Sequence, residues 1–254
     1  MTVPISPKGP NLNAAAVVPA AGRGERLGPG APKALRELGG VPILVHAVRV
    51  LARSRAVETV VVVAPKDGVA EVRALLADAI GERESAALVV VPGGDTRQES
   101  VRAGLAVLPA DVDVVLVHDA ARPLVPVDVV DSVARAVADG AEAVVPAVPL
   151  ADTVKQVTPA AAAGLPEPVV ATPDRATLRA VQTPQGFRRD VLDRVHAKAL
   201  EEGVDATDDA GLVERFGGRV VVVPGHEEAF KVTRPLDLVL AEAVLARRRS
   251  RDEF

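Results

Sequence analysis

The 254-residue chain contains no cysteine, tryptophan or tyrosine, and its only aromatic side chains are four phenylalanines. Without cysteine it cannot form disulfides, thiolate metal sites or a cysteine nucleophile. So few aromatic rings leave little material for stacking bases, and a net charge of -4 provides no cationic surface for phosphate backbones. No apolar run reaches the ~18 residues of a membrane span. We therefore expect no nucleic-acid partner and no membrane association.

The first 13 residues also lack the apolar core of about 7–15 residues that is typical of a secretory signal. Together with the absence of cysteine, this predicts a cytoplasmic protein. The chain is 48% apolar and 25% charged, which is typical of a globular protein with a full hydrophobic core.

Short valine-rich runs alternate with segments of helical periodicity from Ala14 onward. Residues 60–63 are all valine and therefore apolar on both faces, as in a strand covered by helices on each side. This alternation predicts a Rossmann-like α/β fold, with a mostly parallel sheet flanked by helices. We expect one domain over residues 14–248, with disordered tails at 1–13 and 249–254. Strands are predicted at 14–19, 57–64, 87–91, 113–118, 142–148 and 219–223, and helices at 42–54, 67–80, 98–108, 127–139, 188–202, after 207, and at 235–248.

The alternation stops between Leu150 and Phe187. Two β-prone segments, 152–158 and 169–172, flank a stretch rich in alanine, glycine and proline. This pattern predicts a β arm, at about residues 150–183, that protrudes from the sheet, with a surface loop as the alternative. Because two strands alone are marginally stable in water, we expect the arm to pack against a second copy of the chain in a homodimer.

The first predicted strand continues into the loop PAAGRGERL at residues 19–27, and Lys33 follows closely. Small residues there let backbone N–H groups approach a phosphate, and Arg26 and Lys33 add two cations. A dinucleotide-binding fingerprint needs glycine or alanine where Leu27 stands, and a P-loop needs Gly-Lys-Ser/Thr where residues 32–34 are Pro-Lys-Ala. The loop is thus either a simple βα turn or a phosphate site outside those two classes.

A second turn, PGGDTRQES at residues 92–100, follows the third predicted strand. Its Asp95, Thr96 or Ser100 could cap the next helix or contact a ligand.

The segment HDAARP at 118–123 places Asp119 and Arg122 just past the fourth predicted strand, on the side where such sheets bind ligands. We expect His118 to be a structural imidazole. In KVTRP at 231–235, Lys231 precedes the last predicted helix, and on its own it would be a surface charge.

Taken in order, these motifs resemble the 2-C-methyl-D-erythritol 4-phosphate cytidylyltransferase family over about residues 14–245. The resemblance also includes Asp152-Thr153, Asp174-Arg175, Thr183-Pro184-Gln185 and Thr207-Asp208. It implies transfer of CMP from CTP to the phosphate of 2-C-methyl-D-erythritol 4-phosphate, with release of diphosphate, in non-mevalonate isoprenoid precursor biosynthesis.

The resemblance also implies roles for individual residues. Arg26 and Lys33 would stabilise the transition state, while Arg175 and Lys231 would hold the attacking phosphate. Mg²⁺ would be held mainly by the CTP phosphates, with no protein ligand that the sequence identifies. The nucleotide would be bound by Ala20, Ala21, Gly22, Gly24, Gly94, Asp95, Ser100 and Ala120, and the polyol by Asp119, Arg122, Thr153 and Thr207, with Thr153 and Arg175 serving the partner's site.

Two other functions remain open at this point. A cytidylyltransferase for another polyol phosphate, such as ribitol 5-phosphate, would share the nucleotide loops and differ in the acceptor pocket. A non-catalytic nucleotide-binding scaffold belongs to another class, and the presence of all four expected cations counts against it.

Overall fold

The computed structural model describes residues 13–22, 33–80 and 86–252. The helices are α1 (Ile43–Arg53), α2 (Val69–Ala79), α3 (Arg97–Leu105), α4 (Val127–Ala138), α5 (Arg189–Glu202), α6 (Asp209–Arg215) and α7 (Pro235–Asp252). The strands are β1 (Ala14–Pro19), β2 (Glu37–Leu38), β3 (Val41–Pro42), β4 (Val57–Ala64), β5 (Ala87–Pro92), β6 (Val114–Val117), β7 (Ala143–Pro149), β8 (Gln156–Val157), β9 (Val169–Ala171), β10 (Arg179–Val181), β11 (Gln185–Arg188) and β12 (Val220–Pro224). None of the helices in these residues combines the length and hydropathy needed to cross a membrane.

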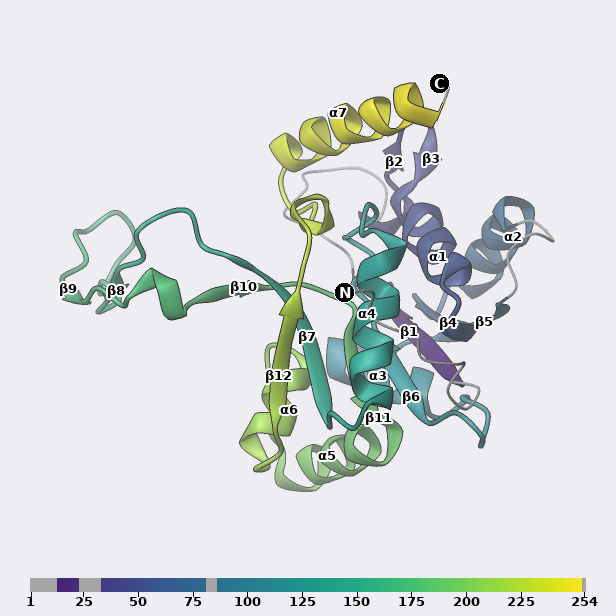
Figure 1. Ribbon diagram of the computed structural model, residues 1–254, viewed down its shortest axis with the longest axis horizontal. Helices are drawn as coiled ribbons and strands as arrows, with labels where there is room; N and C mark the ends of the chain where they lie inside the picture. The colour runs from purple at the N-terminus through teal and green to yellow at the C-terminus, as the bar shows by residue number, and fades with distance from the viewer. Residues whose placement is uncertain (1–12, 23–32, 81–85, 253–254) are drawn as a thin grey trace, which may run out of the picture.

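One central sheet runs in the order β10-β7-β11-β6-β1-β4-β5, and β12 pairs with β7 (Figure 1). The pairs β6-β1, β1-β4, β4-β5 and β7-β12 are parallel, whereas β10 and β11 are antiparallel to their neighbours. The predicted fold class, a mostly parallel sheet flanked by helices, is confirmed. The carboxyl ends of β1, β4, β5 and β6 consequently meet at one edge of the sheet, where ligands bind in this class of fold.

The valine run in β4 shows how the sheet separates two cores. Val60 and Val62 belong to a buried core that also contains residues of α1, α2 and α4, and Val61 and Val63 belong to a second core that contains residues of α3, α5 and α6. Successive side chains of a strand point to opposite faces, so an unbroken apolar run requires helices on both sides. The prediction made from residues 60–63 is confirmed.

Two elements near the arm differ from the sequence-based prediction. Strands β10 and β11 were not predicted, because each is short and β11 contains Gly186. A Cβ at Gly186 would lie 2.6 Å from a methyl of Val133, so the glycine lets α4 pack closely on the sheet.

Helix α7 continues to Asp252, so residues 249–252, expected in a disordered tail, are helical. Asn13, also expected in a tail, donates a hydrogen bond to the Asp111 carboxylate, and the rest of the expected tails, residues 1–12 and 253–254, lies outside the described residues.

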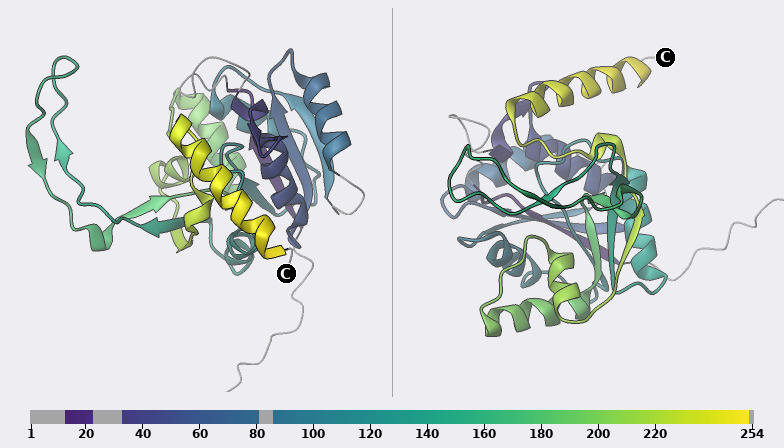
Figure 2. Two further views of the ribbon diagram at one scale, coloured as in Figure 1. Left: turned by 90° about the horizontal axis from the view of Figure 1, so that it is seen from above. Right: turned by 90° about the vertical axis from the view of Figure 1, so that its left-hand side faces the viewer.

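The predicted arm is present and projects from the body of the molecule (Figures 1 and 2). Its antiparallel strands β8 and β9 are shorter than the predicted segments 152–158 and 169–172. Leu165, Val169 and Val170 on the arm are more than half exposed. The arm therefore presents apolar side chains to solvent in the single chain.

Candidate active site

A cavity of about 290 Å³ opens at the carboxyl ends of β1 and β6, beside the turn before α3. It brings together nine residues that the sequence assigned to one site: Ala20, Ala21, Gly22, Gly94, Asp95, Ser100, Asp119, Ala120 and Lys231. Pro19, Ala34, Thr96, Arg97 and Ala121 complete the described lining. One wall is thus made of small residues and backbone, and another edge carries charged side chains.

The turn before α3 is held by a capping box. The Thr96 side chain accepts a hydrogen bond from the Glu99 backbone N–H, and the Glu99 carboxylate accepts one from the Thr96 N–H. Of the three residues that could have capped α3, which are Asp95, Thr96 and Ser100, Thr96 is the one that does. Ser100 is buried, where its hydroxyl accepts from the Gly94 N–H and donates to the Thr96 carbonyl. The Asp95 side chain is left 88% exposed and pairs with Lys66.

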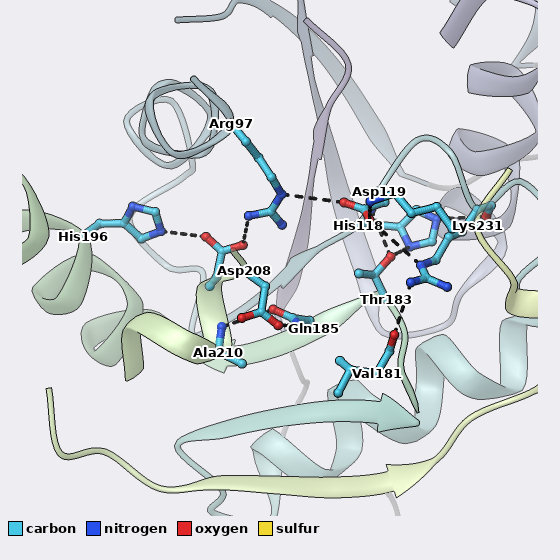
Figure 3. Close-up of polar contacts among 12 residues, drawn as sticks. Arg97, His118, Asp119, Val181, Thr183, Gln185, His196, Asp208, Ala210 and Lys231 are labelled. Atoms are coloured by element: carbon cyan, nitrogen blue, oxygen red, sulfur yellow. Dashed lines mark hydrogen bonds and ion pairs between the residues drawn. The ribbon is translucent and has the colours of Figure 1, made fainter. Parts of the chain in front are cut away.

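Asp119 follows β6 and faces three cations (Figure 3). Its Oδ2 lies 2.7 Å from Lys231 Nζ and 4.0 Å from Arg122 Nε, and its Oδ1 lies 3.7 Å from Arg97 Nε. Burial by itself would raise the pKa of Asp119, but the three cations outweigh burial and lower the pKa to about 2. Asp119 is therefore an anion at neutral pH and holds Lys231 at the cavity.

A neutral histidine holds the backbone beneath Asp119. His118 is fully buried, and its Nε2 lies 3.2 Å from the Arg122 carbonyl, which can only accept, so Nε2 carries the proton. Nδ1 then accepts from the Thr183 hydroxyl, whose oxygen accepts from the Asp119 N–H. Burial lowers the pKa of His118 to about 4. The structural role expected for this imidazole is confirmed.

Two residues buried behind the cavity had no motif to mark them. Asp209 and His196 are 1% and 2% exposed, and the His196 Nε2 hydrogen bonds to Asp209 Oδ1 at 2.9 Å. The other oxygen, Oδ2, lies 2.7 Å from Nη1 of Arg97, which lines the cavity. Arg97 stood inside the turn at residues 92–100, and its position next to the cap was the only sequence signal for it.

Four described residues that were assigned to the site do not line this cavity: Arg122, Thr153, Arg175 and Thr207. Arg122 donates to the carbonyls of Ala229 and Val181 and thereby ties β10 to the loop after β6. Thr207 is exposed and precedes Asp208, the cap of α6.

Thr153 and Arg175 are exposed residues of the arm, and Arg175 donates to the Ala151 carbonyl. Gly24, Arg26 and the Lys33 side chain lie outside the described part of the structure.

Mg²⁺ was expected to be held mainly by the CTP phosphates, so side chains that could hold a metal ion were sought among the described residues. No three histidine, aspartate or glutamate side chains among them come close enough to share a metal ion. The two carboxylates on the cavity, Asp95 and Asp119, are each paired with a lysine. This lining fits a Mg²⁺ ion that would be held mainly by the oxygens of a bound phosphate chain and by water.

Comparisons with known proteins agree with this arrangement. The family model described as IspD, 2-C-methyl-D-erythritol 4-phosphate cytidylyltransferase, matches residues 14–247. Proteins with that name from Streptomyces avermitilis and Streptomyces coelicolor are 70% and 71% identical, over 98% and 94% of this chain and 97% and 87% of their own.

Two solved structures share the fold. The 4-diphosphocytidyl-2C-methyl-D-erythritol synthase of Anaerococcus prevotii has a TM-score of 0.78 at 27% identity, covering 93% of this chain and 100% of its own. The 2-C-methyl-D-erythritol 4-phosphate cytidylyltransferase of Thermus thermophilus has a TM-score of 0.67 at 36% identity, covering 91% and 97%.

Proposed function

The chain belongs to the 2-C-methyl-D-erythritol 4-phosphate cytidylyltransferase family, and from that premise we propose that its cavity transfers CMP from CTP to the phosphate of 2-C-methyl-D-erythritol 4-phosphate. One observation carries the assignment to this cavity: a wall of small residues and backbone faces an edge where Lys231 is held by an ionised Asp119. A triphosphate and a phosphate acceptor need both kinds of surface side by side.

The nucleotide belongs on the wall of small residues. The turn at Gly94, Asp95 and Ser100 offers backbone groups and short polar side chains, which suit the small hydrogen-bonding edge of cytosine. Ala20, Ala21, Gly22 and Ala120 leave room for the sugar and the phosphates. Gly24, Arg26 and Lys33 would extend this surface along the triphosphate, with Mg²⁺ held by the phosphates.

The reaction needs positioning and charge stabilisation more than proton transfer. An oxygen of the acceptor phosphate forms a bond to the α-phosphorus of CTP, and the bond from that phosphorus to the bridging oxygen of the β-phosphate breaks, which releases diphosphate. Lys231, 40% exposed and fixed by Asp119, would hold the attacking phosphate in line. Arg26 and Lys33 would stabilise the extra negative charge of the transition state.

The arm supports a homodimer in which each site is completed by its neighbour. Leu165, Val169 and Val170 expose apolar surface that a second copy would bury, and Thr153 and Arg175 lie on the same arm. We propose that these two polar residues reach the acceptor in the partner's site. The cytoplasmic location expected from the sequence stays a prediction.

Diphosphate release from CTP, measured with 2-C-methyl-D-erythritol 4-phosphate and with ribitol 5-phosphate, tests the proposal. We expect the first acceptor to be preferred. Lys231→Gln should lower turnover by about 10²-fold, because removing one preorganised charged group typically costs about 3 kcal/mol in the transition state. The control is Lys198→Gln, since Lys198 is a residue of α5 that lies over the Phe216 ring and does not line the cavity.

Three results would contradict the proposal. A preference for ribitol 5-phosphate would move the assignment to another polyol phosphate, and absence of diphosphate release with either acceptor would favour a non-catalytic protein. Full activity of folded Lys231→Gln would contradict the proposal that the reaction takes place in this cavity.

A further inference from the structure

Asp209 is a carboxylate buried behind the active-site cavity. It is the first residue of α6 and is 1% exposed. Burying a carboxylate is costly unless it is paired. Here Oδ1 accepts from His196 Nε2 at 2.9 Å, and Oδ2 lies 2.7 Å from Arg97 Nη1. The fold therefore maintains a charged residue whose one contact toward the cavity, among the described residues, is the Arg97 guanidinium.

Arg97 occupies a position that the local helix disfavours. It is the first residue of α3, where the positive end of the helix dipole opposes a cation. Two carboxylates offset this: Asp209 at 2.7 Å and Asp119 at 3.7 Å. The side chain is 31% exposed and lines the cavity. A guanidinium has five N–H donors in a rigid fork, so these two carboxylate contacts leave donors for a ligand.

The two cations of the cavity share one carboxylate. Lys231 lies against Oδ2 of Asp119, and Arg97 faces Oδ1 of the same group (Figure 3). Charges thus alternate from Asp209 through Arg97 and Asp119 to Lys231. If the ion pair with Asp209 were absent, Arg97 would pair with Asp119 instead, and it would then compete with Lys231 for the Asp119 carboxylate. The position of Arg97 in the cavity, and with it the pairing of Lys231, depends on a buried anion from another helix.

We propose that Arg97 binds the phosphate of the acceptor alongside Lys231, and that Asp209, supported by His196, is a positioning residue that holds Arg97 for this role. The proposal rests on the function proposed above. It assigns Arg97 to the acceptor and not to the nucleotide because Arg97 shares Asp119 with Lys231. An arginine fork and a lysine on either side of one carboxylate form a cationic pair suited to a phosphate dianion.

A double-mutant cycle of Arg97→Gln, Asp209→Asn and the combined variant tests this, with steady-state diphosphate release as the assay. Each single change should raise the KM for the acceptor about tenfold, because a hydrogen bond to a charged group is lost or misplaced. The combined variant should show the same KM as Arg97→Gln alone, since Asp209 acts through Arg97. The KM for CTP should stay within about twofold of wild type.

The matched control is Glu228→Gln. Glu228 is also mostly buried and pairs with two arginines, Arg247 and Arg248, but it does not line this cavity. It should lose thermal stability without a change in either KM. A stability loss alone therefore cannot imitate the expected rise in the acceptor KM.

Effects that multiply in the combined variant, equal increases in both KM values, or an unchanged acceptor KM in folded Asp209→Asn would each overturn the proposal. If Asp209→Asn does not fold, Asp209→Glu takes its place, because it keeps the charge but displaces the carboxylate by one carbon. A raised acceptor KM in that variant supports the positioning role, and a wild-type value overturns it. Wild-type protein without diphosphate release would instead refute the proposed function.

Discussion

Mild acid should weaken this fold through one buried imidazole, that of His118. The ring is fully buried and neutral, and it links the Arg122 carbonyl to the Thr183 hydroxyl that supports Asp119. Protonating Nδ1 would remove the acceptor for that hydroxyl and place a charge in the core. Acid should therefore disturb the backbone that carries Asp119 in the active site, and it should also lower the stability of the whole fold.

The size of the effect follows from the pKa of His118 in the two states. Burial lowers the pKa from 6.5 to about 4 in the folded protein, so between these values the unfolded chain binds a proton that the folded protein does not. The free energy of unfolding should be unaffected by His118 above pH 6.5, fall as the pH decreases from 6.5 to about 4, and level off below that. At about 1.4 kcal/mol per pH unit, the complete loss is about 3 kcal/mol, a large share of a typical folding free energy.

Urea unfolding of wild type and His118→Gln, each at about pH 7.5 and about pH 5, measures this contribution. Glutamine keeps a neutral amide that can donate to the Arg122 carbonyl, and it does not titrate. The wild type should lose about 2 kcal/mol more than the variant over this pH interval. The contribution of His46, whose pKa is also lowered by burial, is common to both proteins and cancels. An equal pH dependence in the two proteins would refute a neutral buried His118.

Three further predictions concern the site and the arm. Gly93→Ala should raise the KM for CTP at least about tenfold, because its Cβ would lie 2.7 Å from that of Ala21, whereas Gly68→Ala, with only ordinary contacts, should not. CTP should be used far better than ATP in the diphosphate-release assay, and equal use would contradict the role of the turn. Mixing inactive Arg175→Ala and Lys33→Ala chains should restore activity in up to about half of the mixed-dimer sites once subunit exchange is verified with tagged chains, and no recovery would refute action across subunits.

Periodicity alone was sufficient for the main elements of the fold. The strands at 14–19 and 57–64 were predicted at their observed bounds, because a sheet covered on both faces leaves unbroken apolar runs in the sequence. The helix at 127–139 was found within one residue of α4 because one face of it is buried. The two antiparallel strands next to the arm were not found, since three or four residues carry too little pattern.

The motifs likewise identified most of the cavity lining, because loops at the carboxyl ends of adjacent parallel strands converge at one edge. A motif shows which residues occur together along the chain, and it gives no contact between distant segments. The fold alone decided that Arg122 would brace the loop after β6 through two carbonyls. The cap of α3 is a different case, because its two hydrogen bonds join Thr96 and Glu99, and the pattern Thr-x-x-Glu in the sequence already favours Thr96 over its neighbours.

The row of charges at the cavity, from Asp209 through Arg97 and Asp119 to Lys231, is the clearest case of a feature that tertiary structure decided. Asp119 and Lys231 are 112 positions apart and meet at 2.7 Å. Arg97 and Asp209 meet at the same distance although they begin different helices. Sequence shows that each of these residues can carry a charge, but the strength of an ion pair depends on separation and burial. Those two quantities exist only once α3, α6, the loop after β6 and the segment before α7 have come together at the cavity.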